Sequence, residues 1–99
     1  MKLVFISGPY RGHASDNIEC ARKAAIRLWE AGYAVFCPHL NTAHFELDCK
    51  CEDEVYLKGD LEILKRCDAI YMLRGWEESV GAVAEREAAI MQGKEIIYE

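Results

Sequence analysis

Residues that can do chemistry gather in the stretch ESVGAVAERE, residues 78 to 87. Ser79 and Gly81 stand where an alanine-rich helix would begin, and Glu85 lies four residues after the glycine. Free backbone N–H groups at a helix start favour an anion, and a serine hydroxyl adds a donor. Serine is also a common helix cap. Glu85 is therefore either a solvent-facing acid or a carboxylate at the rim of a binding site.

A second acid, Asp60, makes the best chemical pair with Glu85. Cleavage of a glycosidic bond uses one carboxylate near the anomeric carbon and one acid near the leaving group. The first must be ionised, and the second must hold its proton near neutral pH. Spacing alone does not bring the two together, and each acid has a solvated or capping role as its alternative. Glu87 competes with Glu85, but it lies two residues on and points to a different helix face.

The segment Gly8-Pro9-Tyr10-Arg11-Gly12 lies between a strand pattern and a helix pattern. It is not a Walker loop, because Gly-Lys-Ser/Thr is missing, and its glycine spacing does not fit a dinucleotide fingerprint. Gly8 would let a ligand approach the backbone, and Arg11 could pair with a phosphate. The alternative is a plain turn with an exposed arginine.

Three further groups are weaker candidates. His39 and His44 fall in a segment that would face the same site, and loop packing explains them equally well. Trp76 could stack on a base or a sugar, or it could form a hydrophobic lid or an oligomer contact. Cys49-Lys50-Cys51 is a poor match to a tetrahedral zinc site, because no second cysteine pair exists. We expect no metal and no cofactor.

The apolar pattern predicts the elements that must position these groups. A helix is expected from Asp16, which with Glu19 forms a capping-box-like start, to Gly32. Another is expected over residues 80–92. Residues 39–50 show no clean period and are expected to form a loop, while Gly59 should interrupt a short helix. Continuous apolar runs predict four strands, KLVFIS, YAVFCP, AIYML and EIIY.

This alternation predicts one domain, residues 1–99, of the α/β class. We expect a three-layer, flavodoxin-like parallel sheet of about four strands, in the order 2-1-3-4, with helices on both faces. In such sheets, ligands bind beyond the carboxyl ends of the strands where the strand order reverses. Three segments meet there, SGPYRG, PHLNTAH and RGWEESVG. Since the helix of Glu85 opens from the third segment, its interpretation as a site residue is favoured.

Composition limits the class of partner. The net charge of −5 argues against a nucleic-acid polymer or an anionic membrane as the main partner, but it leaves room for a small anion. The start, MKLVFISGPY, does not resemble a signal peptide, and no apolar run approaches the roughly 20 residues of a membrane span. A cytoplasmic location is therefore expected. The 5 cysteines are predicted to be reduced and mostly buried.

Three segments, FISGPYRG, DLEILKRCDAIYML and GWEESVGAVAEREAA, together resemble the nucleoside 2-deoxyribosyltransferase-like superfamily. The resemblance extends through most of the chain in the right order, and its middle and late segments are the most specific. The functional branch most similar to this chain is that of the 2′-deoxynucleoside 5′-monophosphate N-hydrolases. Small phage and bacterial members of the superfamily are closer still in overall sequence.

The resemblance implies roles for individual residues. The family pattern Asp/Ser-x-Gly-x₃-Glu falls on Ser79, Gly81 and Glu85, and makes Glu85 the nucleophile that attacks the anomeric carbon. Asp60 occupies the position of an aspartate that assists departure of the base. Tyr10 lies in a place similar to that of a tyrosine that orients the nucleophile. A serine at position 79, where transferases usually have aspartate, should favour a 5′-phosphate, because like-charge repulsion is removed.

We therefore expect cleavage of the N-glycosidic bond of a (deoxy)nucleoside 5′-monophosphate, by hydrolysis or base exchange. The expected partner is a small nucleotide or nucleoside, and the expected assembly is a homodimer or a larger homo-oligomer. Two alternatives stay open: a module that binds a nucleotide or an ADP-ribose-like ligand without cleaving it, and a protein that keeps only the fold. The expected catalytic residues are Glu85, Asp60 and Tyr10, and the expected binding residues are Gly8, Arg11, Gly12, Ser79, Gly81, His39 and Trp76.

Overall fold

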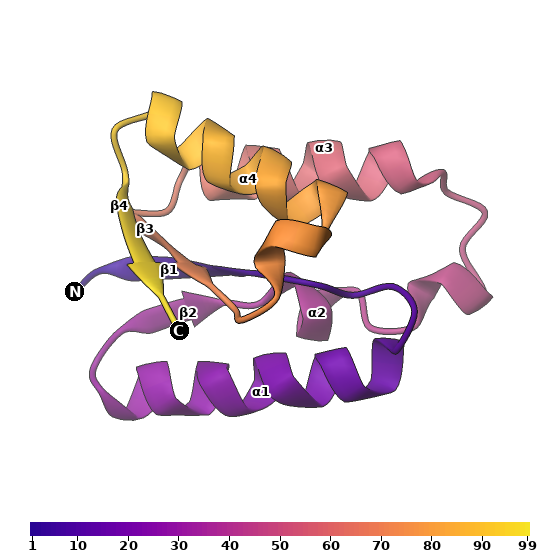
Figure 1. The fold of residues 1–99 in the computed structure, drawn as a ribbon, viewed down its shortest axis with the longest axis horizontal. Coiled ribbons are helices and arrows are strands. Elements are labelled where there is room, and N and C mark those ends of the chain that lie inside the picture. Colours follow the sequence, from indigo (N-terminus) through magenta and orange to yellow (C-terminus); the bar gives the residue numbers. More distant parts are fainter.

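A parallel sheet of four strands runs through the middle of the computed structural model, which describes residues 1–99 (Figure 1). The strands lie in the order β2-β1-β3-β4, which confirms the predicted order. The chain passes from β1 to β2 on one side and then crosses to β3 on the other, so the order reverses between β1 and β3. The strands are β1 (Leu3–Ser7), β2 (Ala34–Phe36), β3 (Ala69–Met72) and β4 (Glu95–Tyr98).

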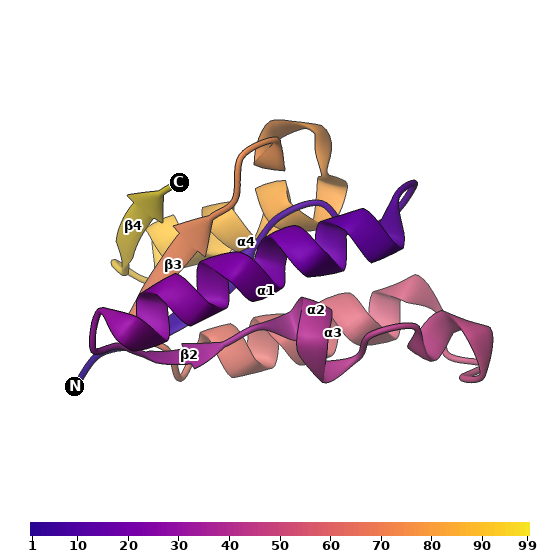
Figure 2. The ribbon, with the colours of Figure 1, turned by 90° about the horizontal axis from the view of Figure 1, so that it is seen from below.

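Helices cover both faces of the sheet, as predicted. Helix α1 (Ala14–Glu30) lies on one face, while α3 (Asp53–Leu64) and α4 (Val80–Met91) lie on the other. Figure 2 looks onto α1 from the side opposite α4. None of these helices combines the length and the apolar character that a membrane span requires.

The central strand β1 explains why its sequence is an uninterrupted apolar run. Val4 and Ile6 pack into the core on the α1 side, and Phe5 packs into the core on the α3 and α4 side. All three side chains are fully buried. A strand that is covered on both faces has no position left for a polar residue that faces water.

Helix α1 begins three residues earlier than the capping pattern predicted. Its first cap position is His13, and the backbone N–H of Asn17 donates to the carbonyl of His13. Asp16 therefore lies inside the first turn, where its charge still favours the helix dipole. The helix ends as predicted, because Gly32 adopts a φ of +96° directly after the last turn.

The segment after β2 was predicted to be a loop and is partly helical. Pro38 begins a short helix, α2 (Pro38–Asn41), because its fixed φ suits the first helical position and its missing N–H has no partner to lose there. A single 3₁₀ turn follows at Phe45–Leu47. Too few residues are involved for a helical period to be recognised in the sequence.

The predicted break at Gly59 does not occur. Helix α3 runs without interruption from Asp53 to Leu64, with Gly59 exposed on its outer side. A glycine costs a helix about 1 kcal/mol, and burial of Leu64 with Leu61 against the sheet outweighs this cost. Asp60 consequently sits in the middle of a helix and does not cap one.

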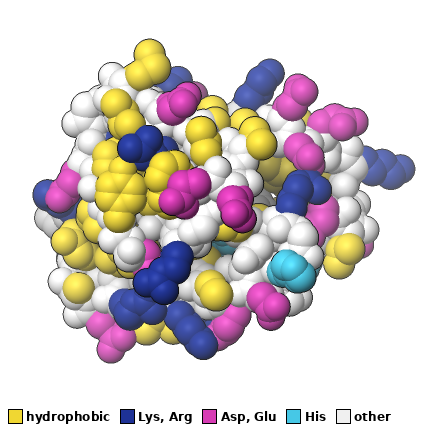
Figure 3. All heavy atoms as spheres, in the orientation of Figure 1, with side chains coloured by type: hydrophobic (Ala, Val, Ile, Leu, Met, Phe, Trp, Pro, Cys, Tyr) yellow, Lys and Arg dark blue, Asp and Glu magenta, His cyan; other side chains and the backbone are white.

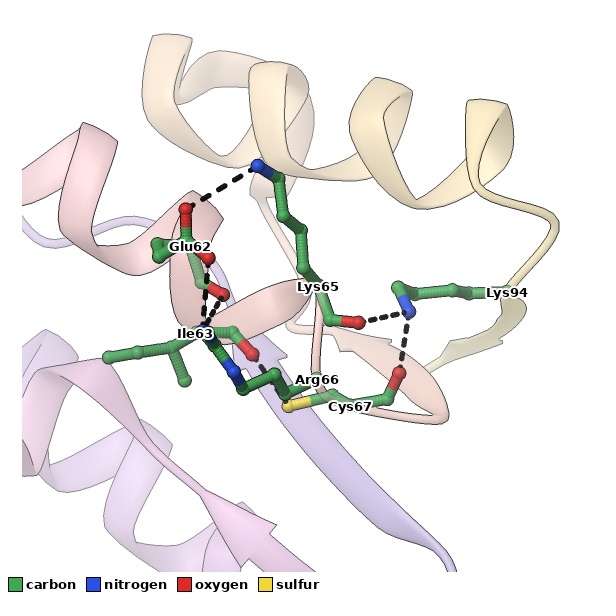
Figure 4. Close-up of polar contacts among 6 residues, drawn as sticks. All are labelled: Glu62, Ile63, Lys65, Arg66, Cys67 and Lys94. Carbon is green, nitrogen blue, oxygen red and sulfur yellow. Dashed lines mark hydrogen bonds and ion pairs between the residues drawn. The ribbon is translucent and has the colours of Figure 1, made fainter.

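Lys94 connects the end of α3 to the start of β4 (Figure 4). Its ammonium group donates to the carbonyl of Lys65 at 3.1 Å and to the carbonyl of Cys67 at 2.7 Å. These carbonyls follow the last helical turn and have no helical partner of their own. The contact fixes the α3–β3 connection and thereby the position of α3 along the sheet.

The cysteines are all free thiols, but fewer of them are buried than predicted. Only Cys37 and Cys67 lie in the core. Cys20 and Cys51 are exposed, and Cys49 is half-buried.

Two glycines predict opposite effects on stability. Replacing Gly59 by alanine should raise the free energy of unfolding by about 0.5–1 kcal/mol, because the added methyl group meets no atom and the helix gains propensity. Replacing Gly8 by alanine should lower it by roughly 1–3 kcal/mol, because the new Cβ would lie 2.6 Å from the Cβ of Leu73. Urea titration of both variants measures the two changes. A Gly8→Ala protein as stable as the parent would contradict the close approach of β1 to Leu73.

Candidate active site

A cavity of about 600 Å³ opens at the carboxyl ends of β1, β2 and β3. This is the volume of an ordinary small-molecule site, and the place is the one where the strand order reverses. Each of the three segments expected to meet there contributes to the lining. The predicted site residues that line the cavity are Gly8, Tyr10, Arg11, His39, Asp60, Ser79, Gly81 and Glu85.

Glu85 lies on the buried stripe of α4. The buried residues of this helix are Ala82, Glu85 and Ala89, which are spaced three and four apart and face the sheet. The side chain of Glu85 occupies a position that the pattern reserves for an apolar residue, and the residue is only 7% exposed. Glu87, the competing acid, is exposed to solvent.

Ser7 holds the carboxylate of Glu85. The hydroxyl of Ser7 donates to Oε1 of Glu85 at 2.6 Å, and this is the one hydrogen bond that the carboxylate makes in the protein. Side chains alternate along β1, so Ser7 points to the same face as Phe5, toward α4. At 1% exposure, Ser7 is sealed beneath the cavity and is not part of its lining.

The two acids of the expected pair both have raised pKa values. Burial raises the pKa of Glu85 to about 7, against the hydrogen bond from Ser7, which lowers it, while the charge of Asp60 raises it further. Burial raises the pKa of Asp60 to about 6. The two carboxyl groups face one cavity from α4 and α3, and the ionisation of one opposes that of the other. Their titration range is the one that general acid–base chemistry requires.

Tyr10 does not make the contact with Glu85 that the resemblance implies. Its hydroxyl donates to Oε1 of Glu46 at 2.8 Å and accepts the backbone N–H of His44 at 2.8 Å. The ring of Tyr10 lies 5.9 Å from that of His39, centroid to centroid. Tyr10 therefore joins the loop after β1 to the segment before α3, at the rim of the cavity.

Arg11 makes a second contact across the same rim. Its guanidinium group forms an ion pair with Asp53, the first residue of α3, and both side chains are largely exposed. An exposed pair of this kind contributes little to stability. It does leave the guanidinium group within the cavity lining, where a more strongly charged anion can compete with Asp53 for it.

His39 is a buried, neutral histidine. Its Nε2 lies 2.7 Å from the carbonyl oxygen of Pro9, and because a carbonyl only accepts, Nε2 carries the proton. Burial lowers the pKa of His39, and its Nδ1 is buried without a hydrogen-bond partner. The residue thus supports the loop after β1 from the first turn of α2.

The start of α4 offers unpaired donors. The hydroxyl of Ser79 caps the helix by accepting the N–H of Ala82 at 3.2 Å. The N–H groups of Val80 and Gly81 make no hydrogen bond in the protein, and both residues line the cavity. Two free amides and the positive end of the helix dipole therefore meet at one wall of the cavity.

The lining is acidic overall. Figure 3 shows carboxylate side chains gathered on the right of this face, where α3 and the segment before it lie in Figure 1. No group of three or more His, Cys, Asp and Glu side chains is arranged to hold a metal ion. Besides Arg11, the charged residues of the lining are Glu46, Asp53, Glu54, Asp60, Glu78 and Glu85.

Two predicted binding residues lie outside the cavity. The 3₁₀ turn Trp76–Glu78 directs Trp76 toward β4, where its ring lies 6.2 Å from that of Tyr98. The guanidinium carbon of Arg86 sits 4.8 Å above the indole. Gly12 adopts a φ of +89° in the turn before α1, beyond the cavity lining. The structure thus places Trp76 against β4 and Gly12 beyond the loop that lines the cavity.

Ser7 was missed among the candidates. Its signal in the sequence is that a polar residue ends a strand whose preceding residues, Leu3 to Ile6, are all apolar. Such a residue lies at the carboxyl end of the central strand, where the site of a parallel sheet is found. The alternation of side chains then places its hydroxyl on the α4 face.

Comparison with known proteins gives a family and a fold. The family model described as "Domain of unknown function (DUF4406)" matches residues 2–98. No curated protein matches the sequence. The 2-deoxyribosyltransferase of Bacillus psychrosaccharolyticus superposes with a TM-score of 0.69 at 21% identity, over 97% of this chain and 70% of that enzyme. The 2-desoxiribosyltransferase of Leishmania mexicana gives a TM-score of 0.69 at 16% identity, over 99% of this chain and 63% of that one. The chain thus has the fold that the resemblance predicted.

The raised pKa of Glu85 predicts that stability falls as pH rises. A carboxyl group with a pKa near 7 in the folded protein and 4.5 ordinarily keeps a proton that the unfolded chain releases. Its stabilising effect is complete below pH 4.5 and is lost as the pH rises through 7. We expect Glu85 to lower the free energy of unfolding by on the order of 3 kcal/mol between about pH 5 and pH 8, with Asp60 acting in the same direction.

Urea titrations across this range, at constant ionic strength, measure the change. The Glu85→Gln variant should lose most of the pH dependence and become more stable than the parent at the alkaline end. Glu87→Gln removes an exposed acid from the same helix and should leave the dependence as it is. Equal pH dependence in the parent and in Glu85→Gln would show that Glu85 is not buried as described.

Proposed function

We propose that this chain, which belongs to the DUF4406 family, cleaves the N-glycosidic bond of a (deoxy)nucleoside 5′-monophosphate, by hydrolysis or base exchange. One observation carries the proposal. Glu85 occupies a position on the buried stripe of α4 where an apolar residue is expected, and it lines a cavity together with Asp60. Burying a carboxylate destabilises the folded protein at neutral pH, so its position favours a role in function over one in stability.

The chemistry follows from the two acids. Glu85 attacks C1′ of the sugar, the C1′–N bond breaks, and a glycosyl ester forms on the carboxylate. Asp60 gives a proton to the departing base. Water then attacks C1′ in hydrolysis, or a second base does so in exchange. The ionised Asp60 takes the proton of the attacking group, the ester bond breaks, and Glu85 leaves as a carboxylate. The partial positive charge that develops at C1′ is stabilised by the same carboxylate.

This sequence requires an ionised Glu85 and a protonated Asp60 at the moment of attack. In the free protein burial raises both pKa values, that of Glu85 to about 7 and that of Asp60 to about 6, so both acids are partly protonated near neutral pH. A bound sugar changes the balance, because the electron-poor anomeric carbon favours the charged form of Glu85. A carboxylate is then ready to attack, and Asp60 holds the proton that the base needs.

The 5′-phosphate has donors available at the start of α4. The free N–H groups of Val80 and Gly81 and the hydroxyl of Ser79 lie in the cavity wall, and a helix start favours an anion. Arg11 would leave Asp53 for the more highly charged phosphate. The carboxylates of the lining oppose further negative charge, which favours a monophosphate over longer phosphate chains.

Substitution of the two acids tests the reaction. The Glu85→Gln variant should lower kcat for release of free base by at least about 10³-fold, because an amide is no nucleophile. Asp60→Asn should lower it by roughly 10²- to 10⁴-fold, because the proton donor is lost. Incubation with each deoxynucleoside and ribonucleoside monophosphate, followed by chromatography for the base, measures the rates and names the substrate.

Glu87→Gln is the matched control, since it changes an exposed acid two residues away on the same helix. It should release base as fast as the parent. If Glu85→Gln is as active as the parent, the proposed nucleophile is wrong. If the parent releases no base but is stabilised against heat by a nucleotide that is recovered unchanged, the chain is a binding module.

The ion pair between Arg11 and Asp53 predicts two opposite changes in KM. Arg11→Met should raise KM for the monophosphate about tenfold, because a charge-assisted contact is lost. Asp53→Asn should lower it, because Arg11 no longer has a competing partner. Neither variant should change KM for the corresponding nucleoside without a phosphate. Steady-state kinetics with both substrates measure this, and equal effects on both would place the phosphate elsewhere.

A further inference from the structure

We propose that Ser7 is a positioning residue that fixes Oε1 of Glu85 and leaves Oε2 as the oxygen that attacks the anomeric carbon. This inference rests on the proposed function and assigns a role to a residue of β1, a strand in which sequence analysis identified no candidate. It follows from the contact between the last residue of the central strand and the buried stripe of α4.

The geometry gives the two carboxylate oxygens different surroundings. Oε1 accepts the hydroxyl hydrogen of Ser7 at 2.6 Å, which is a short hydrogen bond between two oxygens. Oε2 makes no hydrogen bond within the protein, and Glu85 lines the cavity. The bond to Ser7 restricts rotation of the carboxylate, so the free oxygen keeps one direction in which to meet the substrate.

Ser7 cannot act on the substrate directly. It is 1% exposed, and the cavity is lined by its neighbours Ile6 and Gly8 but not by Ser7. Its backbone is fixed as well, because its carbonyl accepts the N–H of Leu73 and Ser7 pairs with Met72 across the sheet. The hydroxyl thus lies at the end of a central, buried strand of the sheet, and it acts only through Glu85.

The hydrogen bond from Ser7 shifts the pKa of Glu85 in the direction opposite to its other surroundings. Burial and the neighbouring Asp60 both raise the pKa of Glu85, and the hydrogen bond from Ser7 alone lowers it. The remaining ionisable groups of the cavity lie on the loop after β1, on α2, on the segment before α3, on α3 itself and before α4. They are Tyr10, Arg11, His39, Glu46, Asp53, Glu54, Tyr56 and Glu78. Tyr10 bonds to Glu46, and Arg11 pairs with Asp53, so none of these four groups makes a hydrogen bond to Glu85.

A pair of nearly isosteric variants isolates the hydroxyl. Ser7→Thr keeps the donor and adds a methyl group, whereas Ser7→Val has the same shape as threonine but no donor. Any cost of packing the larger side chain is common to both, so their difference reports the hydrogen bond. Ser7→Ala removes the donor without adding bulk. Thermal unfolding of all three identifies a variant that fails to fold.

Two measurements report the ionisation of the Glu85 carboxylate. The first is a ¹³C NMR titration of the Glu85 side chain, assigned with Glu85→Gln, which needs no activity. The second is the pH dependence of kcat and KM for base release. We expect the pKa of Glu85 to be higher in Ser7→Val and Ser7→Ala than in Ser7→Thr, and the acidic limb of the rate profile to move with it. At alkaline pH, where Glu85 is ionised in every variant, kcat should still be roughly ten- to hundredfold lower without the donor, with KM unchanged.

The outcomes separate this inference from the proposed function. Equal titration curves and equal kcat in Ser7→Val and Ser7→Thr, in a protein whose Glu85→Gln variant is inactive, would overturn the role of Ser7 alone. If the parent releases no base, the proposed reaction fails, and with it the attacking role of Oε2. The titration then still decides whether Ser7 holds the carboxylate. A rate that falls without any movement of the pH profile or the titration would reduce Ser7 to a packing residue.

Discussion

The arrangement of the site depends on one constraint, the placement of a carboxylate on the apolar stripe of a helix. Ala82 and Ala89 press α4 against the sheet, and Glu85 lies between them on the same face. Small neighbours let the helix approach closely, so the carboxyl group comes within reach of the hydroxyl at the end of β1. Removing that acid from water costs free energy at neutral pH, and other interactions in the fold must offset this cost.

Burial of apolar side chains in the two cores, one on either side of the sheet, offsets this cost. Strand β1 contributes Val4 and Ile6 to one and Phe5 to the other, and all are fully buried. The strand that anchors the fold is therefore the same strand that delivers Ser7 to the site. Because β1 is anchored in both cores, the hydroxyl of Ser7 stays in place although burial of Glu85 is unfavourable. Unfavourable burial of this kind is common where activity and stability compete.

Sequence reasoning recovered what periodicity and topology determine. Continuous apolar runs identified the strands, their order followed from the alternation with helices, and the order located the cavity. The residues Ser79 and Glu85 lie within one helix start, so they were predicted to lie near each other, and the strand order with the family resemblance then favoured a place in the site for Glu85. Asp60 is a candidate from the chemistry of paired acids and from the family resemblance. Its position inside α3 cannot be predicted locally, because Gly59 disfavours a helix and the burial of Leu64 that offsets this depends on tertiary packing.

What sequence reasoning could not provide were the contacts between distant segments. The bond from Ser7 to Glu85 joins residues 78 positions apart, and the clasp of Tyr10 on Glu46 joins residues 36 positions apart. Neither follows from propensity or spacing, because each depends on how two elements meet in space. The same holds for Trp76. A ring in this loop could face the cavity or β4, and its orientation depends on packing against Arg86, which the local sequence does not show.

The rim of the cavity adds a last physical consequence. Tyr10 and Arg11 come from one short loop, and both reach across to the segment that leads into α3, through Glu46 and Asp53. The contacts are polar and largely exposed, so each is weak compared with the buried bond at the floor of the cavity. A rim held by weak contacts can open for a ligand without disturbing the sheet, whereas the floor keeps its geometry. The fold thus combines a rim held by weak, exposed contacts with a buried contact that orients Glu85.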